Sequence, residues 1–260
     1  MNILKKIKIK IVKKYIKKKK IFFEETNLTS LPAHNFSEQK NFSDHLKDEC
    51  NKFRNNKNNP GPYTCNYLIP FIKNLNSTEI NFLDIGAGSL KNYFSLINNL
   101  ENLNYFFYDL PTTSKTVEII AKEEKLKKIS ILDFSGIKNQ NFDLIFLGST
   151  IQYIADYEHF ILNLLKLNPK FILFSALPCF HSSIEKKKFF IIKQLNLYPD
   201  INYLYQFNVD EFKKIFLENN FKELFSIENT TQPYMNFNNF KNKNITPQYI
   251  DLIFKNDPKQ

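Results

Sequence analysis

The sequence predicts an α/β protein with a mostly parallel β-sheet and helices on both faces of that sheet. From Ile80 onward, short and nearly continuous apolar runs alternate with segments of helical periodicity. Strands that are apolar throughout are buried on both faces, and their alternation with helices is typical of parallel crossover units. The 260 residues, 43% of them hydrophobic, suffice for one large domain.

A glycine turn is the best-defined point of this pattern. The apolar run Ile80–Leu83 ends in Asp84, and the turn Gly86-Ala87-Gly88 follows it closely. Apolar residues from Leu90 to Leu100 then have the spacing of a helix face. Glycine reaches positive φ and has no Cβ, so a ligand can approach the backbone here, and the following helix offers unpaired N–H groups. A plain tight turn explains a Gly-x-Gly pattern equally well.

The later elements continue the alternation of strands and helices. Strands are expected over 104–108, 129–132, 141–147, 171–174, 221–227 and 249–254, and helices over 113–125 and 158–166. A further helix is expected to begin after Asn208 as its N-cap and to stop at Asn219-Asn220. Residues 177–206 contain Pro178, Pro199 and the run Lys186-Lys187-Lys188, and are expected to form an excursion over the edge of the sheet.

Two segments precede the main domain, which is expected to span residues 77–260. Residues 1–20 hold ten lysines, no acidic residue and apolar residues at roughly helical spacing. They are expected to form a basic amphipathic tail that can lie on an anionic membrane surface; a solvated tail shaped by codon bias is the alternative. Residues 21–76 are asparagine-rich with Pro60 and Pro62 as breakers, and are expected to form an N-terminal cap or linker with a short helix over 67–75.

The net charge of +10 does not indicate a nucleic-acid groove. Ten of the 36 basic residues lie in residues 1–20, so the remaining chain carries 26 basic and 26 acidic side chains. Because the body is electrically balanced, no nucleic-acid partner is expected. The scattered Cys50, Cys65 and Cys179 indicate neither a disulfide framework nor a metal site. A cytoplasmic location is expected, because no apolar run suits a signal peptide or a membrane span.

Acidic residues stand at the ends of the first three expected strands, namely Asp84, Asp109 and Asp133. Ligands of parallel sheets bind at the carboxyl ends of the strands. Asp109 follows Gly88 by 21 residues, which is the spacing at which a carboxylate accepts hydrogen bonds from ribose hydroxyls. These residues predict a cofactor that contains a nucleoside, although Asp133 is equally suited to capping a loop.

Details of the turn narrow the class of cofactor. A dinucleotide fingerprint needs a third glycine where Lys91 stands, and the Gly-Lys-Ser/Thr of a P-loop is missing. An acidic residue directly before the turn repels a pyrophosphate but suits a cationic amino-acid group. S-adenosylmethionine carries an ammonium and a sulfonium, so Asp84 makes it the predicted cofactor.

Residues 80–90 resemble motif I of class I S-adenosylmethionine-dependent methyltransferases, and the resemblance covers about residues 61–254. It implies a Rossmann-like fold with a seven-stranded, mostly parallel sheet, helices on both faces and a final antiparallel strand. More narrowly, Leu147–Ile154 with Asp109-Leu110-Pro111 and Lys193-Gln194 resembles a methyltransferase family of bacterial surface-polysaccharide gene clusters. This narrower resemblance implies O-methylation of a sugar or surface-glycan precursor.

The resemblance also implies roles for individual residues. Contacts to the cofactor are implied for Asp84, Gly86, Ala87 and Gly88 at the methionine part, Asp109 and Leu110 at the ribose side, and Asp133 with Phe134 at the adenine. Ser149, Gln152 and Tyr153 are implied to border the transferred methyl group and the acceptor, with Gln194 also on the acceptor side. For Gln152 and Tyr153, packing under the following helix is the alternative.

Two departures from the family pattern bear on activity. Ser175-Ala176 stands where that family often has Asp-Arg, and the glycine motif is short. No residue is identified as a general base, but methyl transfer can proceed chiefly through alignment of the reacting atoms.

Two alternative functions are a degenerate methyltransferase fold that only binds its ligands, and methyl transfer to another small molecule. The tetrapeptide typical of adenine-N6 methylation is replaced by Gly148-Ser149-Thr150-Ile151. A peripheral position at the inner face of the membrane is expected if residues 1–20 bind lipid.

Overall fold

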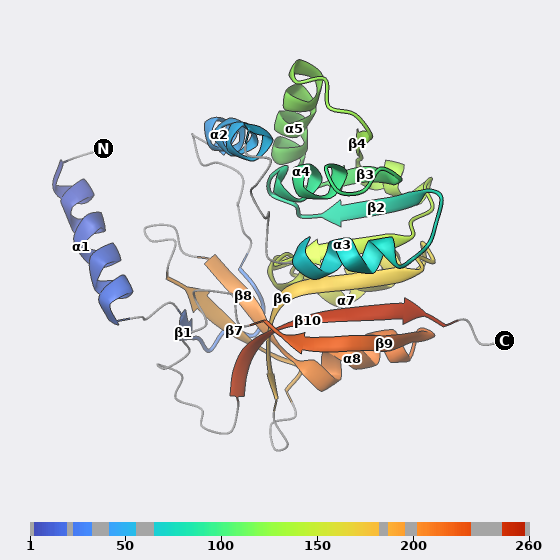
Figure 1. The fold of residues 1–260 in the computed structure, drawn as a ribbon. Helices are drawn as coiled ribbons and strands as arrows, with labels where there is room; N and C mark the ends of the chain where they lie inside the picture. The colour runs from blue at the N-terminus through green and yellow to red at the C-terminus, as the bar shows by residue number, and fades with distance from the viewer. Residues whose placement is uncertain are drawn as a thin grey trace.

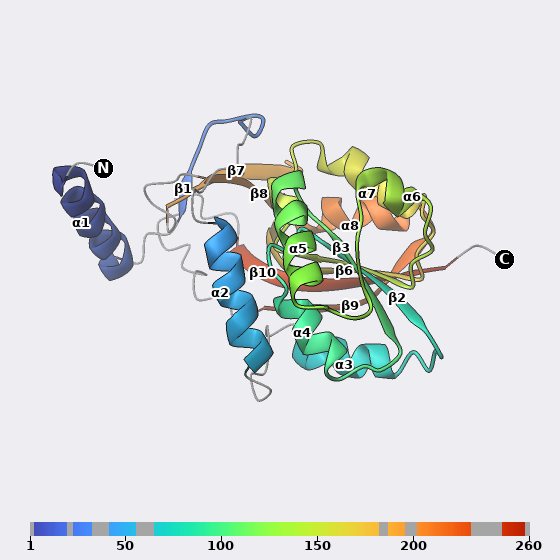
Figure 2. The same cartoon turned by 90° about the horizontal axis from the view of Figure 1, so that it is seen from above.

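The computed structural model describes residues 3–19, 23–32, 42–55, 65–181, 187–195, 202–229 and 246–257. A twisted sheet runs through the molecule and carries helices on both faces (Figures 1 and 2). Pro60, Pro62, Pro199 and Lys186, which the sequence singles out, lie outside the described residues.

The elements keep the alternation that the sequence predicts from Ile80 onward. The helices are α1 (Ile3–Lys19), α2 (Phe42–Asn55), α3 (Cys65–Lys73), α4 (Lys91–Ile97), α5 (Pro111–Glu123), α6 (Phe134–Lys138), α7 (Tyr157–Leu165) and α8 (Val209–Leu217), with a 3-10 turn η1 (Ile151–Tyr153). The strands are β1 (Phe23–Glu25), β2 (Ile80–Ile85), β3 (Leu103–Tyr108), β4 (Ile129–Ile131), β5 (Leu144–Gly148), β6 (Phe171–His181), β7 (Phe189–Gln194), β8 (Asn202–Asn208), β9 (Phe221–Glu228) and β10 (Thr246–Asn256).

The described strands form one ten-stranded sheet. Seven of them follow the order β4-β3-β2-β5-β6-β10-β9. Strands β4, β3, β2, β5 and β6 pair in parallel, whereas β10 is antiparallel to both β6 and β9. The predicted fold class, a mostly parallel sheet with a final antiparallel strand, is confirmed.

Three further strands extend this sheet beyond the expected seven. Strand β6 runs past the end of β5, and its residues Cys179 and Phe180 pair with Phe207 and Asn208 of β8. Strand β8 pairs antiparallel with β7, and β7 with β1. The described parts of residues 177–206, expected to be an excursion, therefore contribute strands to the sheet. The apolar run of β6 simply continues through Pro178, which is buried with its neighbours.

Alternate residues of β2, β5 and β6 enter two hydrophobic cores on opposite sides of the sheet. On β2, Phe82 packs in the core formed with helices α2 to α5, and Leu83 in the core formed with α6, α7 and α8. Figure 2 shows α3 and α4 on one side of the sheet and α6, α7 and α8 on the other. Burial on both faces explains why the strands read as continuous apolar runs.

The N-terminal third contains more secondary structure than the expected linker. Helix α2 buries Leu46 and Cys50 in the core that it shares with α3, α4 and α5. Nζ of Lys47 on α2 lies 3.9 Å from Oε2 of Glu123 on α5. Helix α1 projects from one end of the molecule, away from the sheet (Figure 1). Within the described residues, none of the helices combines the length and apolar character that crossing a bilayer requires.

The ends of α8 follow the local signals in the sequence. The Asn208 side chain accepts a hydrogen bond from the Asp210 backbone N–H at 3.2 Å, and it caps the first turn. After the last turn, Asn220 takes a positive φ of 63°, the left-handed conformation that asparagine tolerates better than most residues. Both predictions for this helix are confirmed.

Candidate functional site

The carboxyl ends of β2, β3 and β5 meet at one edge of the sheet. Because β2 is parallel to both neighbours, Ile85 lies beside Tyr108 of β3 and beside Leu147 of β5. The residues that follow these positions are therefore neighbours. The structure thereby brings the glycine turn, Asp109 and Ser149 to the same edge, as the sequence predicts.

Asp84 is a fully buried carboxylate at the end of β2, with an exposed fraction of 0%. Its Oδ2 accepts hydrogen bonds from the Tyr105 hydroxyl and from the Asn92 amide, the latter at 2.9 Å. Its Oδ1 has no hydrogen-bond partner in the described residues. Burial raises the pKa of Asp84 to about 7, since the two donors lower it less than desolvation raises it. A cation held close to the turn would favour the ionised form of Asp84.

Asp109 holds the glycine turn in place. Its Oδ2 accepts a hydrogen bond from the Gly88 backbone N–H at 2.8 Å, and its Oδ1 accepts one from the Leu110 N–H at 2.6 Å. Burial raises the pKa of Asp109, and the hydrogen bonds from Gly88 and Leu110 partly oppose this effect. A carboxylate offers about four acceptor positions, so Asp109 retains capacity for a ligand hydroxyl beside the turn.

The two glycines of the turn have different surroundings. Both take positive φ, 65° at Gly86 and 62° at Gly88. A Cβ on Gly86 would lie 2.2 Å from Cγ2 of Thr150, whereas a Cβ on Gly88 would meet nothing within 4 Å. Gly86 is therefore required by the packing of the protein itself. Gly88 leaves open space on the side from which a ligand can approach.

Thr150 is a residue of this site that sequence reasoning missed. Its hydroxyl lies within hydrogen-bond distance of three backbone carbonyl oxygens, those of Ile85 (3.1 Å), Gly86 (3.2 Å) and Gly148 (3.0 Å). It therefore ties the turn after β2 to the loop after β5. The only sequence signal is its position in the segment that follows β5.

Replacing Thr150 with valine is expected to lower the free energy of unfolding by about 1–2 kcal/mol, because the shape is retained while the hydroxyl donor is lost. Urea unfolding followed by circular dichroism measures this change. Thr116→Val provides a matched control, because the Thr116 hydroxyl donates an exposed hydrogen bond to the Thr112 carbonyl oxygen of the same helix at 3.0 Å. Equal effects of the two substitutions would contradict the role of Thr150.

The residues expected at the ribose side and around the adenine follow β3 and β4. Leu110 and Phe134 are exposed by 47% and 38%, and the Phe134 ring lies 6.4 Å from that of Tyr108. Asp133 is the N-cap of α6 and accepts a hydrogen bond from the Gly136 N–H at 2.6 Å, which holds the pKa of its carboxyl below the usual value. The cap uses Oδ1 of Asp133 as its acceptor. The contact of Asp133 with an adenine stays a prediction.

The residues expected on the acceptor side form a connected polar group. The Tyr153 hydroxyl donates to Oε1 of Gln194 at 2.9 Å, although 41 residues separate them in the chain. The Gln152 side chain lies close to this hydroxyl, and burial raises the pKa of Tyr153 to about 12. Oε1 of Gln152 is buried without a partner in the described residues. Ser149 is exposed and has a positive φ of 52°.

Ser175 and Ala176, where the resembled family has Asp-Arg, serve the internal structure. Both are buried, and the Ser175 hydroxyl and the Ala176 N–H donate to Oδ1 of Asp251 on β10 at 3.0 and 2.6 Å. The same carboxylate accepts hydrogen bonds from Asn229 at 3.0 Å and from Tyr67 of α3 at 2.8 Å. This network connects β6, β10, α3 and Asn229, the residue that follows β9, and it uses the polar groups of Ser175 and Ala176 inside the protein.

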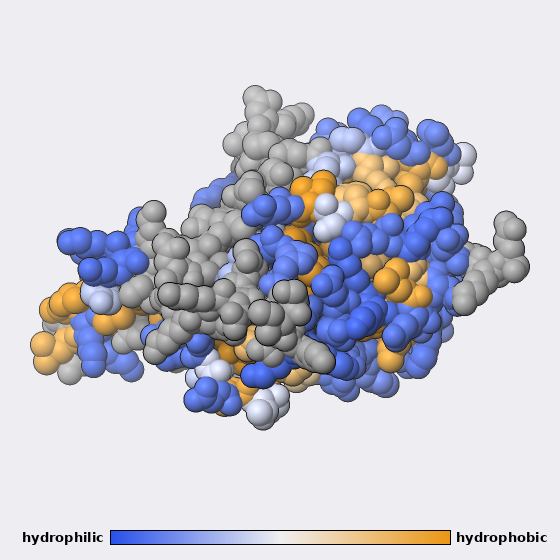
Figure 3. Space-filling model, turned by 90° about the horizontal axis from the view of Figure 1, so that it is seen from below, coloured by the Kyte–Doolittle hydropathy of each residue, from blue (hydrophilic) through white to orange (hydrophobic). Residues whose placement is uncertain are grey.

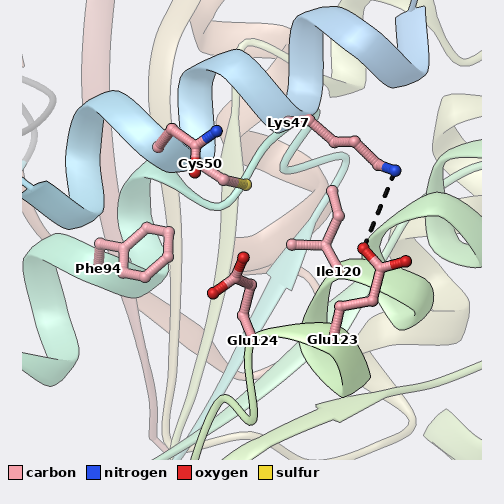
Figure 4. A pocket seen from close by; sticks show the side chains of 7 residues that line it. Lys47, Cys50, Phe94, Ile120, Glu123 and Glu124 are labelled. Atoms are coloured by element: carbon pink, nitrogen blue, oxygen red, sulfur yellow. Dashed lines mark ion pairs between the residues drawn. The ribbon is translucent and has the colours of Figure 1, made fainter.

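A separate hollow lies between α2, α4 and α5 (Figure 4). Its lining includes Cys50, Phe94 and Ile120, with the Lys47–Glu123 ion pair at its rim. These residues come from helices on one face of the sheet. Across the described part of the chain, no group of three or more His, Cys, Asp or Glu side chains is placed to hold a metal ion.

Solved structures share this architecture. A structure from Galdieria sulphuraria, named as a candidate sarcosine dimethylglycine methyltransferase, gives a TM-score of 0.51 at 11% identity over 76% of this chain and 86% of that chain. The magnesium protoporphyrin IX methyltransferase of Synechocystis PCC 6803 with bound SAH gives 0.49 at 12% identity, over 84% and 98%. The 1,6-didemethyltoxoflavin-N1-methyltransferase of Burkholderia thailandensis, holding S-adenosylhomocysteine, gives 0.49 at 9%, over 91% and 99%.

The architecture is thus a Rossmann-like α/β fold with the glycine turn at the carboxyl edge of its sheet. More particularly, it is the fold of class I S-adenosylmethionine-dependent methyltransferases. No protein-family model and no curated protein matches the sequence. The likeness at 11% identity shows the fold alone, and the narrower resemblance to a surface-polysaccharide family stays a prediction.

Proposed function

We propose that this protein is an S-adenosylmethionine-dependent methyltransferase that transfers the methyl group to an oxygen of a sugar or glycan precursor. One observation carries the cofactor part of the proposal: Asp84, whose Oδ1 has no hydrogen-bond partner among the residues that the structure describes, and the Asp109 carboxylate flank a turn that is open at Gly88. Bound S-adenosylmethionine supplies the electrophilic methyl group. The protein aligns that group with the acceptor.

The charges and donors of the site support this cofactor over a nucleotide phosphate. Asp84 suits the ammonium of the methionine part, which would lower the raised pKa of Asp84 by pairing with its charge. Asp109 suits the ribose hydroxyls, and the exposed side chains of Leu110 and Phe134 suit the flat adenine. The Asp84 carboxylate, directly before the glycine turn, would instead repel a pyrophosphate.

The sugar or glycan acceptor rests on the resemblance of residues 147–154 and on the chemistry of the acceptor side. Gln152, Tyr153 and Gln194 form a linked set of amides and one hydroxyl after β5 and on β7. Amides and phenols both donate and accept hydrogen bonds, which matches the hydroxyl groups of a sugar. Strands β7 and β8 lie beside these three residues, and both strands are additions to the expected seven-stranded sheet.

Substituting Asp109→Asn is expected to weaken binding of S-adenosylhomocysteine by about 1.5–3 kcal/mol, because a charged acceptor for ribose hydroxyls is lost. Isothermal titration calorimetry measures the affinity. Asp210→Asn is the matched control, since Asp210 is exposed in the first turn of α8. An unchanged affinity in Asp109→Asn, with the fold intact, would place the ribose elsewhere.

A protein that binds this cofactor without transferring a methyl group is the second candidate. The observation that favours it is the burial of Ser175 and Ala176 in the network of Asp251, where the resembled family has two charged residues. Incubation with labelled S-adenosylmethionine and a panel of sugar nucleotides and glycans distinguishes the two candidates. Transfer of label supports the methyltransferase, and cofactor binding without transfer to any acceptor supports the second candidate.

A further inference from the structure

Helix α1 carries an apolar stripe that faces solvent. Leu4, Ile7, Ile11 and Tyr15 are exposed by 73%, 49%, 64% and 55%, respectively. They recur every three or four residues, so they lie on one face of the helix. Ile16, on a different face, is only 7% exposed. The stripe is therefore not the face by which the helix contacts the rest of the protein.

The positive charge of the protein is concentrated beside this stripe. Lysines occupy nine positions of α1, with no acidic residue in the helix. Lys8 lies one turn after Leu4, and Lys14 and Lys18 lie three residues after Ile11 and Tyr15. These lysines therefore border the stripe or interrupt its edge. Figure 3 shows apolar and hydrophilic side chains next to one another on the projecting end of the molecule.

We propose that α1 docks on the surface of an anionic lipid bilayer, with the stripe in the headgroup region and the lysines against the lipid phosphates and carboxylates. A bilayer surface matches both features, because aliphatic side chains leave water while cations meet anions. A nucleic-acid backbone would match only the lysines and would leave the stripe in water. Residues 21–260 carry 26 basic and 26 acidic side chains, so the net positive charge comes from residues 1–20.

The arrangement of the chain is compatible with this docking. Helix α1 stands at the end of the molecule opposite the C-terminal strand end (Figure 1). The stripe and its lysines are exposed there, and the cofactor edge is formed by other elements, β2, β3 and β5. The proposal is independent of the proposed enzymatic function, because binding of vesicles requires no cofactor.

The absence of tryptophan from the sequence permits a direct test of insertion. Tyr15→Trp introduces a single fluorophore in the stripe, and Leu217→Trp introduces one on α8, where the side chain is 54% exposed. Each full-length variant is titrated with vesicles of phosphatidylcholine alone and of phosphatidylcholine with phosphatidylserine in equal parts. We expect a blue shift of the emission only for Tyr15→Trp and only with the anionic vesicles.

A second pair of variants separates insertion from simple charge attraction. Ile7→Ser with Ile11→Ser is expected to weaken binding to the anionic vesicles by about tenfold or more, since two aliphatic side chains no longer enter the bilayer. Leu217→Ser with Leu224→Ser, also at exposed positions, is expected to leave binding unchanged. Failure of the wild-type protein to bind anionic vesicles would overturn the proposal. Equal binding of the two double variants to the anionic vesicles would also overturn it. So would binding of the wild-type protein to a DNA duplex that is tighter than its binding to the vesicles and is unaffected by Ile7→Ser with Ile11→Ser.

Discussion

Substituting Asp84→Asn is expected to stabilise the protein above neutral pH and to weaken its binding of S-adenosylhomocysteine. The carboxylate is fully buried, one of its oxygens lacks a partner in the described residues, and burial raises its pKa from 3.8 to about 7. Ionisation of Asp84 therefore costs folding free energy at high pH. The neutral amide avoids this cost, while the loss of one acceptor offsets part of the gain.

The pH dependence has a definite sign. Since the folded-state pKa lies above the unfolded-state value, the stabilisation from protonated Asp84 is complete below pH 3.8 and is lost as the pH rises through about 7. We expect Asp84→Asn to exceed the wild type by about 1–3 kcal/mol at about pH 8, and by less at about pH 5. Urea unfolding at both pH values measures the difference. A variant that is less stable than the wild type at the higher pH would contradict the assignment.

Cofactor binding by the wild type is expected to depend on the same titration. A bound ammonium favours ionised Asp84, so affinity for S-adenosylhomocysteine should fall as the pH decreases below about 7. Asp84→Asn should bind more weakly at high pH and should lose this part of the pH dependence. Asp143→Asn serves as the control, because Asp143 also lies near a strand end but pairs with Lys170 at 2.7 Å, away from the glycine turn.

Alanine at Gly86 is expected to act mainly on stability, and alanine at Gly88 mainly on cofactor binding. Gly86→Ala places a methyl group 2.2 Å from Thr150 Cγ2 at a positive φ, and should lower the free energy of unfolding by about 2–5 kcal/mol. Gly88→Ala meets no neighbouring atom, and should cost about 1–2 kcal/mol for its positive φ. Gly88→Ala should nevertheless reduce S-adenosylhomocysteine affinity by about tenfold or more, because the new methyl group occupies the open side of the turn.

A double-mutant cycle keeps this prediction testable if Gly86→Ala unfolds the protein. Thr150→Gly removes the atoms that a Cβ at Gly86 would meet, so Gly86→Ala should be much less harmful in that background. Urea unfolding measures stability, and calorimetry measures cofactor binding. If Gly88→Ala binds S-adenosylhomocysteine as well as the wild type does, the cofactor does not approach the turn from that side.

The sequence predicts the sheet and the cofactor edge because both depend on local patterns. Continuous apolar runs identify β2, β3 and β5, and an acidic residue at the end of a strand must lie at the carboxyl edge of a parallel sheet. The position of Asp109 beside Gly88 follows from these rules, and their 2.8 Å hydrogen bond agrees with them.

Features that depend on distant parts of the chain could not be predicted. Thr150 occupies the space beside Gly86, although the two residues are 64 positions apart in the sequence. Asp251 accepts a hydrogen bond from the Ser175 hydroxyl across a separation of 76 positions. No local periodicity signals either contact. Similarly, β7 and β8 pair with each other and with the extension of β6, so their place in the sheet depends on the tertiary fold. Helix α2 was missed because its apolar residues stand among many polar ones.

Calorimetric titration of the wild-type protein with S-adenosylhomocysteine, with NAD and ATP as competing ligands, tests the central claim most directly. We expect one molecule of S-adenosylhomocysteine to bind per chain, and neither competitor to displace it, because Asp84, directly before the glycine turn, disfavours a pyrophosphate there. Absence of S-adenosylhomocysteine binding by protein that circular dichroism shows to be folded, or preferential binding of NAD or ATP, would contradict the claim.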